Sequence, residues 1–363
     1  QFVADLIINK LKIESLKSLP NNEVEIRPLT LLAGINNSGK STVIQAVRMF
    51  FAASSGDSPL LKGHGDISEI RSKSSSKNSD IKISFEYANG DSDILTISDE
   101  KTIPPRKSPH VIYIGADRLG PRPSLETHQG AGNIPFIGGR GEHVVDFITK
   151  LSALIIPNDL HHECSEGVTL EYEIKGWLNE ISPGVESIFE THAKSDTSHS
   201  EFDGYRSTNV GFGLSYTLPV ITAILSASIQ HEDNTKFTNN VSELWVNEQK
   251  KNGFLLALEN PEAHLHPRGQ TVMGILIAKA ANSGLQIILE THSDHLMDGI
   301  RIAVKNGICE SEKVIFHYLE KDSNSITNLV TPKLNNNGQL ESWPIGFFDQ
   351  TLKNRAVLAK RSS

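Results

Sequence analysis

Eight consecutive residues, Gly34 to Ser41, match the pattern G-x-x-x-x-G-K-[ST]. In this pattern the backbone N–H groups of a loop, together with the N-terminus of the next helix, surround a phosphate group. The ammonium group of Lys40 can reach the β- and γ-phosphates, and the hydroxyl of Ser41 can ligate Mg²⁺. The residues predicted to bind nucleotide here are Asn36, Asn37, Ser38, Gly39, Lys40 and Ser41.

The segments on either side of this loop favour a phosphate site over a chance match. Residues 29–33 are apolar and predict a strand, and residues 42–50 carry apolar side chains at helical spacing. A second apolar segment, residues 254–258, leads directly to Glu259. A buried strand that ends in an acid can deliver a carboxylate to Mg²⁺ beside the loop, although an ordinary core strand is the alternative. We therefore predict Ser41 and Glu259 as metal ligands.

Strands and helices alternate along most of the chain, which predicts an α/β fold with a mainly parallel central sheet. Short β-like segments fill the first forty residues, with a turn expected at Pro20–Asn22. Two further strands flank Asn89-Gly90-Asp91, which is a hairpin signature. These antiparallel segments predict a second, flanking sheet. Other strands are expected at 111–114, 254–258, 285–289, 313–319 and 326–331, and helices within 144–177 and at 266–281 and 294–305.

Composition narrows the class of protein further. The 363 residues carry 35 Lys and Arg against 43 Asp and Glu, a net charge of −8, which argues against a surface that grips nucleic acid everywhere. The two cysteines lie far apart in the chain, so a disulfide framework is not expected. No apolar run reaches the length that crosses a bilayer. We expect a cytoplasmic protein without membrane contact.

Three further motifs resemble a known group of ATPases. They are E-N-P-E-A-H-L-H-P at residues 259–267, E-T-H-S-D at 290–294 and W-P-I-G-F-F-D at 343–349. With the phosphate loop, the first two resemble the ABC-type ATPase heads of the RecF, Rad50, SMC and OLD (overcoming lysogenization defect) class. The third resembles the ending of small stand-alone bacterial AAA-family ATPases that close with a domain of unknown function. The resemblance covers essentially the whole chain.

The resemblance implies roles for individual residues. Thr42 would lie beside the α-phosphate, Glu259 would be the Walker B acid on the metal side, and His292 would sense the γ-phosphate. Residues 209–216 resemble a degenerate signature motif, which in such heads binds the ATP of the opposite subunit. Its nucleotide-binding residues would be Gly211, Gly213 and Ser215. The alternative is a plain loop before a helix.

One position departs from the family pattern. Most relatives place a second acid directly after the Walker B acid, and this chain has Asn260 there. An amide can hold a water molecule but cannot take a proton from it. Glu262, two residues further on, could serve as the base if the chain turns suitably. The resemblance therefore implies catalytic roles for Glu262, Asn260 and His292, with slow hydrolysis of ATP to ADP and phosphate.

The motifs and the resemblance also predict how the chain divides into lobes and which molecules it binds. Residues 1–143 would form the first part of the ATPase lobe, 144–249 a helical lobe with the signature, 250–312 the second part of the ATPase lobe, and 313–363 a small β-rich cap. Family resemblance implies cofactors ATP and Mg²⁺, a homodimer closed around nucleotide, and a separate nuclease or toxin as effector in a bacterial defence system. DNA is a further candidate partner. The alternatives are a non-catalytic ATP-gated switch and a RecF-like DNA repair ATPase.

Overall fold

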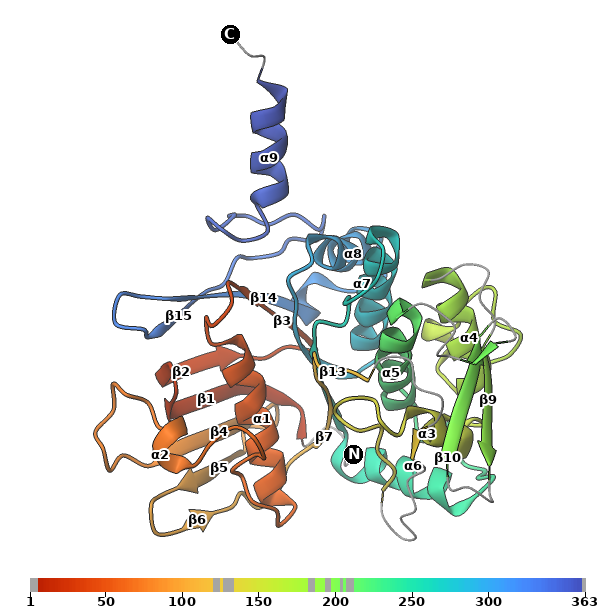
Figure 1. Ribbon diagram of the computed structural model, residues 1–363, viewed down its shortest axis with the longest axis horizontal. Coiled ribbons are helices and arrows are strands. Elements are labelled where there is room, and N and C mark those ends of the chain that lie inside the picture. The colour runs from red at the N-terminus through yellow and green to blue at the C-terminus, as the bar shows by residue number, and fades with distance from the viewer. Residues whose placement is uncertain are drawn as a thin grey trace.

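The structure is a computed structural model, and it describes residues 6–119, 125–126, 134–181, 187–192, 197–202, 205–206 and 212–360. Two large β-sheets and a group of helices make up the molecule (Figure 1). The predicted α/β class, with a mainly parallel sheet beside an antiparallel one, is confirmed.

The larger sheet has six strands, of which only the edge strand β15 runs antiparallel to its neighbour. In spatial order they are β15 (Thr327–Val330), β14 (Val314–Lys321), β3 (Leu29–Gly34), β13 (Gln286–Glu290), β12 (Phe254–Glu259) and β7 (His110–Ile114). The inner strands are continuous apolar runs because both faces of this sheet are covered. All the parallel strands end at one edge, and the phosphate loop leaves β3 at that edge.

The smaller sheet has five antiparallel strands. In spatial order they are β2 (Leu19–Glu25), β1 (Ile8–Leu16), β4 (Ile81–Tyr87), β5 (Ser92–Ile97) and β6 (Thr102–Ile103). The predicted hairpin at Asn89–Asp91 is present between β4 and β5. The turn predicted at Pro20–Asn22 is wrong, because these residues lie within β2 and the chain turns at Lys17 and Ser18. Pro20 is tolerated because β2 is the edge strand of this sheet. The N–H that proline lacks is not needed there for pairing between two inner strands.

Helix α1 (Lys40–Ser54) fills the space between the two sheets. Val43, Val47 and Phe50 recur at helical spacing on its buried face, and the Phe50 ring stacks on Phe85 of β4 with centroids 3.7 Å apart. Alternate residues of the large sheet face this core, so Leu255 points to α1 while its neighbours in β12 point away. Packing on both sides therefore holds α1, which begins at Lys40, between the two sheets.

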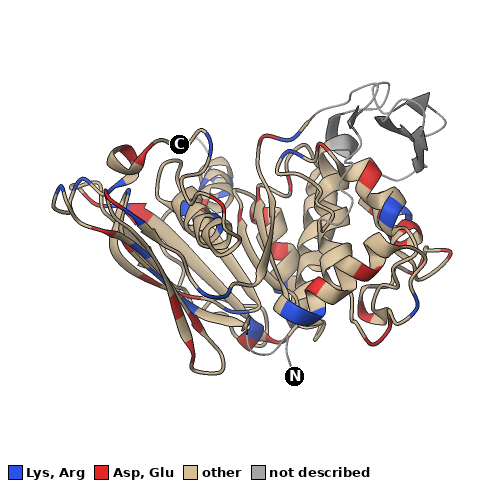
Figure 2. Cartoon of the chain, turned by 90° about the horizontal axis from the view of Figure 1, so that it is seen from below, with Lys and Arg blue, Asp and Glu red and all other residues tan. Residues whose placement is uncertain are grey.

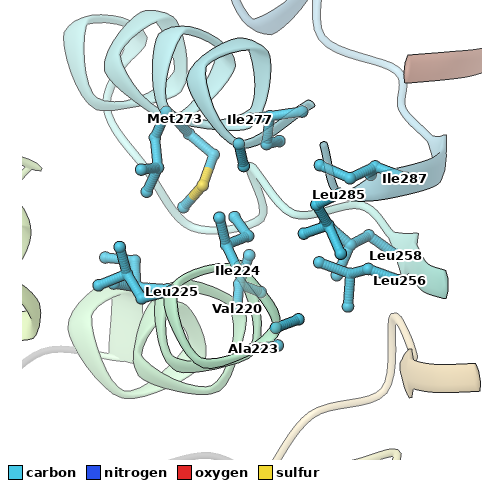
Figure 3. Close-up of a cluster of buried hydrophobic side chains, with 14 of the residues drawn as sticks. Val220, Ala223, Ile224, Leu225, Leu256, Leu258, Met273, Ile277, Leu285 and Ile287 are labelled. Atoms are coloured by element: carbon cyan, nitrogen blue, oxygen red, sulfur yellow. The ribbon is translucent and has the colours of Figure 1, made fainter. Parts of the chain in front are cut away.

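Helices cover the other face of the large sheet (Figure 1). They are α3 (Val144–Leu151), α4 (Leu170–Ile181), α5 (Phe212–Ala227), α6 (Asn240–Asn252), α7 (Pro267–Asn282) and α8 (Asp294–Lys305). Figure 3 shows Ile224 of α5 and Met273 of α7 packed together with Leu256 and Leu258 of β12. None of the helices in the described part of the chain has the length and apolar character needed to cross a membrane.

The remaining elements are short. They are α2 (Ile67–Ile70), β8 (Leu125–Glu126), the 3₁₀ turns at Asn158–Leu160 and Ser311–Lys313, β9 (Ser187–His192), β10 (Thr197–Phe202) and β11 (Tyr205–Arg206). Strands β8 to β11 form a small third sheet that the sequence did not predict.

The C-terminal segment differs from the predicted β-rich cap. Strands β14 and β15 belong to the large sheet, where β14 pairs with β3 along residues 314–319. The chain then forms an irregular segment and ends in helix α9 (Gln350–Ala359), which projects from the body and has no buried residue (Figure 1). Phe347, just before α9, is fully buried. The boundary at residue 313 stays a prediction.

His317 in β14 is buried and hydrogen-bonded at both ring nitrogens. Its Nε2 faces the carbonyl oxygen of Glu25 at 2.8 Å, and since a carbonyl can only accept, Nε2 donates. Its Nδ1 then accepts from the hydroxyl of Thr331 at 2.7 Å, so the neutral ring is satisfied at both nitrogens. Burial lowers the pKa of His317, despite the opposing hydrogen bond to Glu25.

We expect this histidine to make unfolding easier as the pH falls. The folded pKa lies below the ordinary value of 6.5, so the unfolded chain binds the proton more readily and stability is lost as the pH drops below that value. His317→Gln should reduce the pH slope of the unfolding free energy by up to about 1.4 kcal/mol per pH unit in that window. Urea unfolding between pH 7.5 and 5 measures the slope, and equal slopes for the two proteins would refute the assignment.

Candidate functional site

Two glycines give the phosphate loop backbone conformations that other residues rarely adopt. Gly34 has φ of 151° and Gly39 has φ of 110°, both in the region that L side chains avoid. A Cβ atom on Gly34 would lie 2.3 Å from the carbonyl oxygen of Leu319, and one on Gly39 would lie 2.6 Å from Oγ1 of Thr327. The C-terminal strands β14 and β15 therefore form one wall of the loop, which the sequence did not predict.

Side chains from β14 and β15 also fix the loop by hydrogen bonds. The Thr327 hydroxyl donates to the carbonyl oxygen of Ser38 at 2.7 Å, and the Lys321 ammonium donates to Oδ1 of Asn37 at 3.2 Å. Ser38 is buried, and its Oγ finds no hydrogen-bond partner among the described residues. Asn36 is exposed at the tip. Hydrogen bonds from β14 and β15 thus hold the loop, and one buried hydroxyl within it is unsatisfied.

Lys40 is the first residue of α1 and is only 3% exposed. Its ammonium donates to the carbonyl oxygens of Gly34 at 2.6 Å and Ile35 at 2.9 Å, so the loop itself holds the side chain across its mouth. Burial lowers the pKa of Lys40, and the nearby carboxylate of Glu290 opposes that shift. A phosphate at the loop would meet a partly desolvated cation, where electrostatic attraction is stronger than in water.

The two acids that end neighbouring strands have different partners. Glu290, the last residue of β13, accepts a hydrogen bond from the Ser41 hydroxyl at 3.2 Å, and its other oxygen lies 4.0 Å from the Lys40 nitrogen. Glu259, the last residue of β12, accepts from the Tyr113 hydroxyl at 3.1 Å and from the Ala116 backbone at 3.2 Å. The structure therefore brings Glu290 to Ser41, a placement that the sequence analysis missed.

Asn260 and Glu262 lie in the turn after β12. Asn260 has φ of 46°, and its buried Oδ1 has no hydrogen-bond partner among the described residues. Glu262 is buried, accepts from the backbone N–H of His292 at 3.1 Å, and has a second oxygen that makes no hydrogen bond within the described part of the chain. Burial raises the pKa of Glu262, even though its hydrogen bonds act in the opposite direction. The turn thus brings Glu262 and His292 together.

His292 also lies close to Glu290 and Lys40, on the same side of the site as the loop. Its Nε2 lies 3.9 Å from Glu290, and its side chain is 43% exposed. Burial, followed by the charge of Lys40, lowers the pKa of His292. A neutral imidazole at this position can still donate one hydrogen bond to a ligand oxygen.

Arg118 fixes the turn that carries the acids. The side chain is 2% exposed and donates to the backbone oxygens of Gly115, Glu259 and Asn260 at 2.7–2.9 Å. Burial lowers the pKa of Arg118, and the charge of Glu262 opposes this effect. Because the guanidinium contacts backbone oxygens inside the protein, its role here is to position the chain.

Two cavities lie on the β14 and β15 side of the site. One, of about 460 Å³, is rich in basic and hydroxyl groups, and its lining includes Lys17, Ser18, Arg71, Lys73, Ser74 and Lys321. The other, of about 360 Å³, lies between the loop and the C-terminal segment, and its lining includes Gly34, Ile35, His292, Phe348, Asp349 and Lys353. Only the second cavity has residues of the loop itself in its lining, and the first is connected to the loop through Lys321, which donates to Asn37.

Part of the predicted signature lies outside the described residues. This applies to Gly211, and for Gly213 and Ser215 the structure gives only their place in the first turn of α5. Thr42, by contrast, is in α1, and its backbone N–H donates to the carbonyl oxygen of Gly39. The signature residues therefore stay a prediction.

The donor set at the loop fits a nucleotide with Mg²⁺. No group of three or more His, Cys, Asp or Glu side chains in the described ranges could hold a metal alone. Mg²⁺ needs no such cage, since it usually binds one or two carboxylates together with waters and substrate phosphates. The Ser41 hydroxyl and the Glu290 carboxylate both offer the oxygen ligands that Mg²⁺ prefers, and these two groups are hydrogen-bonded to each other. The Ser38 hydroxyl of the same loop has no partner among the described residues.

Comparison with known protein families gives two matches. Residues 7–115 and 173–297 match the family described as AAA ATPase domain, which is more than half of the chain. Residues 309–358 match a protein family of unknown function, DUF3696, and this segment includes β14, β15 and most of α9. A search of curated proteins returned no match.

Comparison with solved structures returned heads of SMC proteins. An SmcHead bound to the C-winged helix domain of ScpA has 14% identity and a TM-score of 0.49, over 91% of this chain and 98% of that chain. The SMC head domain from Thermotoga maritima has 12% identity and a TM-score of 0.43, over 90% and 99%. An Smc head domain with an extended coiled coil, bound to the C-terminal domain of ScpA derived from Pyrococcus furiosus, has 12% identity and a TM-score of 0.46, over 98% and 100%.

Proposed function

Because this chain belongs to the AAA ATPase domain family, we propose that it binds ATP with Mg²⁺ at the loop of residues 34–41 and hydrolyses it slowly. The observation that carries this proposal is the convergence of Lys40, Ser41 and Glu290 at the mouth of this loop. Lys40 would exchange its two loop carbonyls for phosphate oxygens, and Ser41 would hold the metal. The nucleoside would enter the cavity lined by Lys17 and Arg71, which Lys321 connects to Asn37 of the loop.

We assign the hydrolytic step to residues of the turn after β12. Phosphoryl transfer needs a group that orients or deprotonates the attacking water, while charge stabilisation does most of the remaining work. Asn260 can orient water, and the free oxygen of Glu262 can accept its proton. His292, tied to Glu262 through its backbone, would contact the γ-phosphate. Mg²⁺, when bound, would neutralise charge on the phosphates.

Phosphate release from three proteins tests this assignment. Glu262→Gln should lower the rate at least about 100-fold, the smallest usual contribution of a general base, whereas Asn260→Glu should raise it by restoring an acid at the usual position. ATP affinity, measured alongside, should change little in both variants. An unchanged rate in Glu262→Gln would remove Glu262 from the mechanism.

We further propose that two copies close around two nucleotides and control a separate effector, a nuclease or toxin, in a bacterial defence system. The support is the resemblance of residues 209–216 to a signature motif and the resemblance of residues 343–349 to the ending of such ATPases. Sedimentation velocity with ATP and with ADP would test the dimer. A protein that stays monomeric at saturating ATP, also in the slow Glu262→Gln variant, would contradict it.

Asn260 favours one alternative, a switch that ATP closes without turnover. In that case ATP would shift the monomer–dimer population and no phosphate would be released. Phosphate release measured with and without DNA separates the two functions. A RecF-like role in DNA repair has less support, since Figure 2 shows basic and acidic residues interspersed over the antiparallel sheet and the helices. Salt-dependent DNA binding would decide that question.

A further inference from the structure

The W-P-I-G-F-F-D segment, residues 343–349, lies beside the phosphate loop. Its last four residues line the cavity of about 360 Å³, together with Gly34 and Ile35 of the loop and with His292. Figure 1 shows α9, which follows this segment, on the side of the molecule where β14 and α8 lie. No residue of this segment has a role in the proposed reaction, yet the segment and the loop share one cavity.

Three contacts hold the first turn of α9 at this cavity. The chain before the helix is anchored by the buried ring of Phe347. The Thr351 hydroxyl donates to Oδ2 of Asp294, the last residue of E-T-H-S-D, at 2.9 Å. Oδ2 of Asp349 accepts from the backbone N–H of Gly346 at 2.9 Å. The turn is therefore tied both to the buried core and to the first residue of α8.

Phe348 has a backbone conformation that bulky residues rarely adopt. Its φ is 48°, in the left-handed region. Burial of Phe347 before it and the hydrogen bond of Asp349 after it hold the chain in this conformation. Strained conformations gather at ligand sites, where the surrounding structure maintains them. Here the conformation turns the chain into α9, whose Gln350 and Lys353 line the cavity.

Lys353 brings a positive charge to this cavity. Among the described residues that line the cavity, it is the only one with a permanent positive charge. Its ammonium lies 2.7 Å from the carboxylate of Asp349, and its side chain is 51% exposed. An ion pair this exposed contributes little, because water screens it. An ammonium forms stronger, charge-assisted hydrogen bonds with phosphate. A phosphate in the cavity would therefore draw Lys353 away from Asp349.

The position of the cavity indicates which phosphate would meet Lys353. In the proposed function the nucleoside lies beyond Asn37, in the cavity that Lys321 connects to the loop, and His292 contacts the γ-phosphate. His292 lines the same cavity as Lys353, beside Gly34 at the other end of the loop. The phosphate chain would thus run from Asn37 toward Gly34, and its terminal phosphate would be the one within reach of Lys353.

We propose that Lys353 binds the γ-phosphate of ATP, so that the C-terminal segment distinguishes ATP from ADP. This inference rests on the proposed function, because it adds a residue to the same nucleotide site. Asp349 holds the ammonium of Lys353 while the terminal phosphate is absent and releases it when that phosphate binds. Since α9 begins at this turn, the exchange links the bound nucleotide to a helix that projects from the body.

The test is the ratio of two dissociation constants, that for ADP divided by that for a non-hydrolysable imido analogue of ATP. Calorimetric titration in Mg²⁺ gives both constants, and wild type should bind the ATP analogue more tightly. Lys353→Ala should lower the ratio about fivefold, less than a buried charge-assisted hydrogen bond would give, because the side chain is half exposed. Lys353→Arg should restore most of the ratio. Arg355→Ala, which removes an exposed cation from the same helix, is the matched control and should keep the wild-type ratio.

Asp349→Asn separates phosphate binding from a merely structural role of the ion pair. The amide oxygen can still accept from the N–H of Gly346, while Lys353 loses the charge that competes with phosphate, so the ratio should rise. An ion pair that only stabilised the turn would give changes of the same sign in Lys353→Ala and Asp349→Asn. A wild-type ratio near one, an unchanged ratio in Lys353→Ala or a fall in Asp349→Asn overturns the inference. Wild type that binds neither nucleotide overturns the proposed function instead.

Discussion

Replacing Lys40 with alanine is expected to weaken ATP binding at least about 100-fold, because two charge-assisted hydrogen bonds of about 1.5–3 kcal/mol each are lost. In the structure the ammonium holds two loop carbonyls, at Gly34 and Ile35, and phosphate oxygens would take their place. Since Lys40 is buried, its charge acts on the ligand with little screening by water. Isothermal titration calorimetry with ATP and Mg²⁺ measures the loss.

Lys101→Ala is the matched control, since it removes the same charge from the exposed turn between β5 and β6. Its affinity for ATP should equal that of wild type. Thermal unfolding of both variants shows whether the fold is kept. ATP binding that is equally strong with and without Lys40 would mean that the loop does not bind phosphate in the way proposed here.

Replacing Phe347 with alanine is expected to destabilise the protein by about 3–5 kcal/mol, the usual cost of removing a buried phenylalanine. Its ring is fully buried and packs edge-on against Tyr318 of β14 and Trp343, with centroids 5.9 and 5.8 Å away. The cavity left behind would lie beside the strand that forms a wall of the phosphate loop. Urea unfolding followed by circular dichroism measures the change.

Leu352→Ala in α9 is the control for this prediction. Leu352 is 59% exposed on a helix with no buried residue, so its truncation should change stability by less than about 0.5 kcal/mol. Similar losses in the two variants would show that α9 is packed in solution. A negligible loss in Phe347→Ala would show that the C-terminal segment is not anchored to the sheet.

The helices and strands that sequence predicted well are those set by neighbouring residues. The glycine loop needs a strand before it and a helix after it. The apolar residues on either side of Gly34–Ser41 predict both, and β3 and α1 lie there. The helix predicted at 294–305 has the bounds of α8, because Ser293 caps its first turn by accepting from the N–H of Leu296. Local chemistry was sufficient in each case.

The parts that sequence missed depend on which strands are neighbours. Glu259 and Glu290 each end an apolar strand, so their local patterns are equivalent. Only the order of strands in the sheet shows that Glu290 is the one beside Ser41. The same holds for Thr327 and Lys321, which contact the loop from nearly 290 residues away. The turn predicted at Pro20–Asn22 from the turn propensities of proline and asparagine was also wrong. Those propensities do not show that the segment forms an edge strand, where proline is tolerated.

The pairing of β14 with β3 means that the two family segments are not interchangeable modules. The AAA ATPase match ends at residue 297, before β14 begins, yet β14 forms the ladder along the strand that leads into Gly34. A protein truncated between them would carry β3 as a bare edge, which readily recruits strands from other molecules and aggregates. Shuffling of the C-terminal segment among relatives would therefore have to preserve the register of this ladder, residue by residue.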